Sequence, residues 1–178
     1  MRLIAITKPD FYDGEAAFIK RLFESGFDIV HLRKPNSDID NCRNILNELS
    51  SEERSKIVVH DYPELYYEFS LKGIHINKNI VKYPEGYQGF KTRSCHSLEE
   101  VMLYKDDFDY VFLSPIFDSI SKQGYKSALT EEVLRDASRE GIIDEKVVAL
   151  GGVTYDRISL LKDLGFGGAA MMGGAFIS

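Results

Sequence analysis

Residues 57–61 read Ile-Val-Val-His-Asp, an uninterrupted apolar block that ends in two polar residues. Residues 110–113 form a second block of this kind, Tyr-Val-Phe-Leu. Short apolar blocks without alternating polar residues are typical of strands in a parallel sheet covered on both faces. Working outward, the sequence predicts eight strands: Leu3–Thr7, Asp28–Leu32, Lys56–His60, Gly73–Ile76, Phe90–Ser94, Asp109–Leu113, Lys146–Leu150 and Gly168–Met172.

Segments with helical periodicity separate most of these strands, and the alternation predicts a compact α/β (β/α)8 TIM barrel. Because 178 residues lie below the roughly 200 usual for this fold, we expect trimmed elements. An open doubly wound sheet with fewer strands is the alternative, although its opening glycine fingerprint is absent. The helices after strands 4 and 8 are predicted to be vestigial or missing. The other predicted helices are Glu15–Glu24, Asp38–Leu49, Pro63–Phe69, Leu98–Tyr104, Thr130–Ser138 and Tyr155–Leu164.

Composition bounds the class of protein. A 44% hydrophobic chain of this length predicts a single domain over residues 1–178. The net charge of -6 argues against nucleic acid or an anionic membrane as partner. No apolar run approaches the ~20 residues of a membrane span, so we expect a cytoplasmic protein, compatible with a homo-oligomer. Cys42 and Cys95 lack metal-ligand spacing, and both are expected to be reduced and inert.

All four histidines are predicted to lie on strands or at their carboxyl ends, where the active face of such a barrel is built. They are His31, His60, His75 and His96. His75 alone is equally consistent with a side chain that fills a layer of the barrel. The four together favour a site.

Two glycine pairs follow the seventh and eighth predicted strands. They are Gly151-Gly152 and, after Met172, Gly173-Gly174. Glycines let backbone amides approach an anion closely, and these two loops commonly hold phosphate in TIM barrels. A lone Gly-Gly is more often a turn, but the pair of loops favours phosphate binding.

The segment after strand 6 carries hydroxyls and a cation at Ser119, Ser121 and Lys122, which could bind phosphate or pyrophosphate and close over it. A solvated polar loop is the alternative. At the end of strand 3, Asp61 is a candidate Mg²⁺ ligand, since this ion often uses one or two carboxylates together with substrate phosphates. An N-cap of the following helix is the competing role for Asp61.

These blocks together resemble the thiamine phosphate synthase family with its thiazole tautomerase branch, over nearly the whole chain. His31-Leu32-Arg33 is similar to the family's Gln-Leu-Arg block, and His60-Asp61 occupies its Asn-Asp position. Residues 73–76 (Gly-Ile-His-Ile) resemble Gly-Val-His-Leu, and residues 94–100 resemble Ser-x-His-Ser-x-x-Glu. Residues 150–153 (Leu-Gly-Gly-Val) resemble Ile-Gly-Gly-Ile.

The resemblance implies a magnesium-dependent transferase of thiamine biosynthesis that couples hydroxymethylpyrimidine pyrophosphate to thiazole phosphate. Departure of pyrophosphate precedes attack by the thiazole nitrogen, so stabilising the leaving group is the main catalytic task. The implied roles are pyrophosphate binding by Arg33 and Lys122, Mg²⁺ binding by Asp61 and pyrimidine contact by Ser94. Ser119, Ser121, Gly151, Gly152, Met172 and Gly173 would hold the thiazole phosphate, and His31 and His60 belong to the same substrate-binding set.

Three departures from the family pattern bear on this expectation. The lysine two positions beyond Arg33 is replaced by Pro35, for which the neighbouring Lys34 is a candidate substitute. A second Mg²⁺ aspartate is replaced by Ile80, which cannot ligate a cation. The tautomerase branch's proton-transferring histidine after strand 6 is replaced by Pro115.

Synthase chemistry therefore ranks first. Thiazole phosphate tautomerisation is the second alternative, for which His96 or His31 is the candidate general base. A noncatalytic phosphate-ligand binding or regulatory protein is the third. A histidine-ligated metal hydrolase ranks last because the first strand lacks His-x-His.

Overall fold

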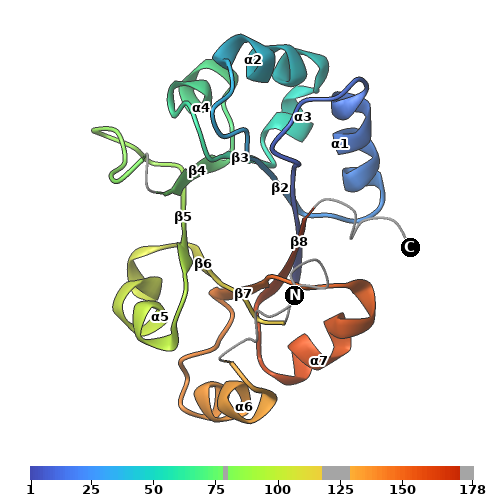
Figure 1. The fold of residues 1–178 in the computed structure, drawn as a ribbon. Coiled ribbons are helices and arrows are strands. Elements are labelled where there is room, and N and C mark those ends of the chain that lie inside the picture. Colours follow the sequence, from blue (N-terminus) through green and yellow to red (C-terminus); the bar gives the residue numbers. More distant parts are fainter. Residues whose placement is uncertain (78–79, 118–128, 173–178) are drawn as a thin grey trace. The chain divides into compact units, whose positions relative to one another are not determined.

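The computed structural model describes residues 1–77, 80–117 and 129–172. Its eight parallel strands follow one another in chain order, β1 to β8, and close into a barrel (Figure 1). The predicted (β/α)8 fold is therefore confirmed, and the open doubly wound alternative is wrong because an open sheet leaves two edge strands. By the density of its contacts the chain divides into two compact units, residues 3–91 and residues 1–2 with 92–178.

The first unit holds four strands and the helices that connect them. Its strands β1 to β3 pair in register, with Ile4 opposite Ile29 and Val30 opposite Ile57, and Val58 of β3 lies opposite Gly73 of β4. The interior side chains are fully buried and branched, as expected for a parallel sheet covered by helices. The elements are β1 (Arg2–Ile6), α1 (Glu15–Glu24), β2 (Ile29–Leu32), α2 (Ile39–Glu48), α3 (Ser51–Arg54), β3 (Ile57–Val59), α4 (Glu64–Phe69) and β4 (Gly73–Ile76).

The second unit repeats the same alternation. Thr92 of β5 lies opposite Tyr110 of β6, Val111 opposite Val147 of β7, and Val148 opposite Gly168 of β8. The elements are β5 (Phe90–Cys95), α5 (Leu98–Tyr104), η1 (Lys105–Asp107), β6 (Tyr110–Leu113), α6 (Glu131–Arg139), β7 (Val147–Leu150), η2 (Tyr155–Arg157), α7 (Ile158–Asp163) and β8 (Gly168–Met172).

The predicted loss of the fourth helix is confirmed for residues 77 and 80–89, which contain no helix. A tyrosine side chain takes its place between β4 and the start of β5. The Tyr87 hydroxyl accepts a hydrogen bond from the amide of Ile74 at 2.8 Å and donates one to the carbonyl of Phe90 at 2.6 Å. One phenol thus satisfies two backbone groups. The segment expected to hold a vestigial eighth helix lies outside the described residues.

Helix boundaries agree with the predictions within one residue except for α7, which begins at Ile158 after the short helix η2 rather than at Tyr155. Two further short elements, α3 and η1, were not predicted. Side-chain caps explain several starts. Asp38 accepts from the amide of Asp40, Ser97 from Glu100 and Thr130 from Val133. In the parts of the chain that the structure describes, no helix is long and apolar enough to cross a membrane.

Candidate functional site

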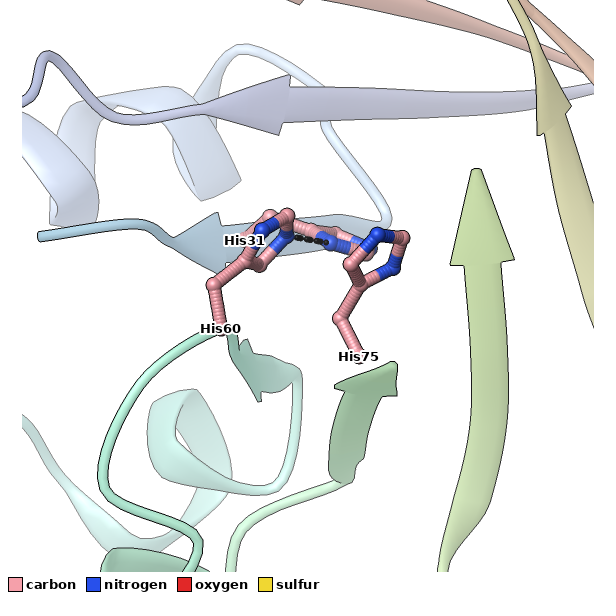
Figure 2. Close-up of side chains that lie close together, drawn as sticks. All are labelled: His31, His60 and His75. Atoms are coloured by element: carbon pink, nitrogen blue, oxygen red, sulfur yellow. Dashed lines mark hydrogen bonds between the residues drawn. The ribbon is translucent and has the colours of Figure 1, made fainter. Parts of the chain in front are cut away.

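Three of the four histidines meet at the carboxyl ends of β2, β3 and β4 (Figure 2). His31 Nδ1 and His60 Nε2 are joined by a hydrogen bond of 2.7 Å. The rings of His60 and His75 are stacked, with centroids 4.0 Å apart and planes inclined by 14°. The His31 ring stands edge-on to the His75 ring at 5.6 Å. We call these three residues the histidine cluster.

Burial sets the charge of this cluster. Exposed fractions are 0% for His31, 7% for His60 and 2% for His75. Burial, followed by repulsion from His75, holds the pKa of His31 well below its usual value. The pKa of His60 is lowered in the same way by burial, then by His75, His31 and Arg33. His31 and His60 are therefore neutral imidazoles near pH 7, with one ring nitrogen of each free of a proton.

Asp61 directly follows His60, and its side chain is held by one backbone hydrogen bond. Its Oδ2 accepts a hydrogen bond from the amide of Lys34 at 3.1 Å. The N-cap of α4 is Pro63, with no side-chain cap, so the alternative role of Asp61 as helix cap is wrong. Among the described residues none donates a hydrogen bond to the other carboxylate oxygen. That oxygen has the chemistry of a hard-cation ligand, so Asp61 fits a single-carboxylate Mg²⁺ site completed by substrate phosphate.

Arg33 and Lys34 follow β2 but differ in environment. The backbone of Arg33 is fixed to Thr7, whose hydroxyl accepts from the Arg33 amide at 3.0 Å and donates to its carbonyl at 3.3 Å. The Arg33 side chain is partly exposed. Lys34 is only 1% exposed, and its ammonium binds the Glu15 carboxylate at 2.6 Å. The expectation that Lys34 replaces the lysine lost at Pro35 is therefore wrong, because its charge is already neutralised inside the fold.

Two predicted site residues lie on β5 and its carboxyl end, in the second unit. Ser94 is partly exposed on the strand, and His96 follows it in an exposed position. The His96 ring nitrogen Nδ1 lies 3.2 Å from the carbonyl oxygen of Ser114, and its amide donates to Glu100 at 2.8 Å. His96 is thus outside the histidine cluster. Its role as a proton-transfer base stays a prediction.

The Gly151-Gly152 turn follows β7 in a conformation that suits glycine. Both residues have positive φ, 94° and 68°. A Cβ at Gly151 would lie 2.9 Å from Pro115 Cα. No described residue accepts a hydrogen bond from the amides of Gly152 or Val153. This geometry is compatible with the predicted phosphate loop, and it also shows a purely structural need for glycine at position 151.

Several predicted residues carry no structural description. Ser119, Ser121, Lys122 and Gly173 lie outside the described residues, and Met172 is the exposed last residue of β8. The structure also places two further residues beside the predicted ones, His75, which was noted among the four histidines, and Asn77, which was not predicted. His75 stacks on His60, and the Asn77 side chain donates to the His60 carbonyl. The alternation of polar side chains at strand ends signalled His75, whereas nothing in the sequence signalled the partner of Asn77.

A closed parallel barrel with polar side chains at the carboxyl ends of its strands defines a (β/α)8 enzyme-type fold, in which small substrates bind at those ends. Residues 3–175 match the family model described as thiamine monophosphate synthase. The chain belongs to this family, and the resemblance noted in the sequence is confirmed.

Individual relatives agree with the family. The crystal structure of thiamine phosphate pyrophosphorylase from Bacteroides thetaiotaomicron is 42% identical, with a TM-score of 0.89 over 97% of this chain and 83% of that chain. A thiamine-phosphate synthase of Halalkalibacterium halodurans is 24% identical over 92% of this chain and 82% of that protein. The thiamine phosphate pyrophosphorylase of Pyrococcus furiosus, 19% identical with a TM-score of 0.75, shares the fold.

Proposed function

We propose that this chain is a thiamine phosphate synthase, which couples hydroxymethylpyrimidine pyrophosphate to thiazole phosphate and releases pyrophosphate. The observation that supports this most is the family match over residues 3–175 together with a 42% identical pyrophosphorylase that covers nearly the whole chain. In the reaction, the bond between the pyrimidine methylene carbon and pyrophosphate breaks with its electron pair on oxygen. The thiazole nitrogen then donates its lone pair to the methylene carbon.

Arg33 and Asp61 are the described residues proposed to act on the leaving group. Arg33 follows β2, which carries His31, and Asp61 follows His60 directly after β3, while the backbone of Arg33 is fixed by Thr7. The guanidinium presents donors in the fork geometry that suits pyrophosphate oxygens. Asp61 would hold Mg²⁺, which when bound neutralises charge on the departing pyrophosphate.

Neutral histidines suit the pyrimidine ring of hydroxymethylpyrimidine pyrophosphate, at the other end of the substrate from the pyrophosphate group. His31 and His60 stand where the family blocks carry Gln and Asn, and neutral imidazoles can donate and accept hydrogen bonds as those amides do. We assign His60 and Ser94 to contacts with the pyrimidine, and His31, which is fully buried, to the same substrate-binding set through its hydrogen bond to His60. The phosphate contacts proposed from the sequence are unchanged. They involve Lys122, Ser119, Ser121, Met172 and the glycine loops at Gly151-Gly152 and Gly173.

Tautomerase chemistry is the less favoured alternative. The residue at the branch's proton-transfer position is Pro115, whose side chain carries no titratable group. His96 is the remaining exposed candidate base. A cytoplasmic location and a homo-oligomeric state stay predictions of the sequence.

The test measures thiamine phosphate formed from both substrates, with Mg²⁺ titrated into metal-free protein. We expect no product without either substrate, loss of activity on chelation, and a fall of about 10- to 100-fold in Asp61→Asn, the effect of losing one charged contact. Asp13→Asn is the matched control, because Asp13 is exposed and no residue of the described part of the chain forms a hydrogen bond or ion pair with its side chain. Product formation that survives chelation, with Asp61→Asn as active as wild type, would contradict the proposal.

A further inference from the structure

Three imidazole side chains that meet in one buried cluster can do more than form hydrogen bonds to a substrate, because unprotonated imidazole nitrogens also bind metal ions. His31, His60 and His75 each offer a ring nitrogen, and these atoms all lie within 4.8 Å of one another. We propose that the histidine cluster is a binding site for a divalent transition-metal ion of the zinc class. This inference goes beyond the proposed synthase activity and does not rest on it.

The positions of the ring nitrogens are close to those of a tetrahedral metal site but differ from them in two respects. Tetrahedral zinc with bonds of about 2.0–2.1 Å to imidazole nitrogen spaces its ligand atoms by about 3.3 Å. His31 Nδ1 and His60 Nε2 lie 2.7 Å apart, so these two atoms need to separate by about 0.6 Å. His60 and His75 additionally require a ring rotation. The lone pair of an imidazole nitrogen lies in the ring plane, and the planes of His60 and His75 are nearly parallel, so their lone pairs do not converge on one ion.

Those adjustments are local. The torsion that turns an imidazole about its Cβ–Cγ bond has broad minima, so a ring can rotate without moving the strand that carries it. All three Cα atoms are fixed on or directly after β2, β3 and β4, which pair with one another. Binding would replace the His31–His60 hydrogen bond and the His60–His75 stack, among the contacts of these rings, by metal–nitrogen bonds.

The donor set selects the class of ion. Imidazole nitrogen suits zinc, copper, nickel and iron, whereas Mg²⁺ prefers oxygen ligands. Burial also keeps the pKa of His31 and His60 low, which leaves their rings in the unprotonated form that ligates metals. Three protein ligands leave a fourth position for water or substrate, as in open zinc sites. His60 is the most exposed of the three residues, at 7%.

The experiment uses the full chain, stripped with a chelator and dialysed. Zn²⁺ affinity and stoichiometry are measured by competition with a chromophoric chelator, and Co²⁺ is added as a spectroscopic substitute that absorbs strongly in tetrahedral sites. The test variants are His31→Gln, His60→Asn and His75→Gln. The first two introduce the residue types of the resembling family blocks, which a barrel of this family accommodates. His96→Gln is the matched control, since His96 is the one histidine of the sequence outside the cluster.

We expect one Zn²⁺ per wild-type chain and a tetrahedral Co²⁺ spectrum, both retained in His96→Gln. Each cluster variant should lose affinity by more than about 100-fold, because even changes outside the ligand shell cost about 10–100-fold. Unfolding midpoints of the metal-free proteins verify that the variants are folded. The inference is overturned if wild type binds Zn²⁺ no better than the cluster variants do.

A second arm separates this site from the proposed Mg²⁺ ligand. Asp61→Asn should keep its Zn²⁺ stoichiometry, and an excess of Mg²⁺ should not displace Zn²⁺ from wild type. Loss of Zn²⁺ in Asp61→Asn would overturn the three-histidine assignment. Because the readout is metal bound rather than thiamine phosphate formed, its failure is distinguishable from failure of the synthase proposal.

Discussion

The ammonium nitrogen of Lys34 lies 2.6 and 2.7 Å from the two carboxylate oxygens of Glu15. The same nitrogen donates to the backbone carbonyls of Lys8 and Asp10, at 2.9 Å each. Burial raises the pKa of Glu15, and its contacts with Lys34 oppose that rise. This pair ties the loop after β1 to the start of α1 and to the chain after β2, so Lys34 serves the fold.

Replacing Lys34 should therefore cost stability. Lys34→Met leaves the Glu15 charge buried without its partner, and breaking such a pair costs about 3–5 kcal/mol. Denaturant unfolding measures the loss. The matched control is Lys56→Met, which removes a lysine from a largely exposed pair with Glu52 and should have a much smaller effect. Equal stability of Lys34→Met and wild type would refute the structural role.

A second prediction isolates the steric need for glycine after β7. Gly151→Ala adds a Cβ 2.9 Å from Pro115 Cα at a residue with φ of 94°. Gly141→Ala is the control, because Gly141 also has positive φ, 71°, but its Cβ would meet no atom within 4 Å. We expect the backbone strain to lower the free energy of unfolding of both variants by about 1–2 kcal/mol. The collision should lower that of Gly151→Ala by about 1–3 kcal/mol more. Thermal and denaturant unfolding of both variants checks the difference, and equal losses would count against the collision.

The histidine cluster predicts how stability depends on pH in the metal-free protein. Unfolded His31 and His60 take up protons below a pKa near 6.5, whereas the folded rings, with pKa values well below that, do not. Well above pH 6.5 both states are almost unprotonated, so these groups add little slope there. As pH falls below 6.5 the unfolded state binds more protons, and stability drops by up to about 1.4 kcal/mol per pH unit for each group.

The free energy of unfolding is measured at pH 7.5 and at pH 5.5, and the difference between the two values tests the predicted pH dependence. His31→Gln and His60→Asn should each lose less stability than wild type over that interval, because each removes one group that titrates in the unfolded state. His96→Gln serves as control, since His96 is exposed and lies outside the cluster. A wild-type slope no steeper than that of His31→Gln would show that the folded His31 ring is protonated as readily as the unfolded one.

Strand and helix patterns predicted the barrel because its strands are continuous apolar blocks between clear helix caps. They also predicted that His31 and His60 would share the carboxyl ends of neighbouring strands. The fate of Lys34 was not predictable, because its partner Glu15 is 19 residues away and its other acceptors are backbone carbonyls, which carry no sequence signal. The stack of His75 on His60 depends in the same way on rotamers that strand periodicity does not encode.

The Tyr87 hydroxyl described above has a consequence for how far this chain can change. A helix between β4 and β5 would protect those strands through many interchangeable apolar contacts, so losing one of them would be tolerated. Here the amide of Ile74 and the carbonyl of Phe90 both bond to one oxygen atom. Phenylalanine at position 87 would preserve the ring and remove both hydrogen bonds at once. A single substitution in this short connection thus removes two hydrogen bonds, a loss that no single apolar contact of a helix could cause.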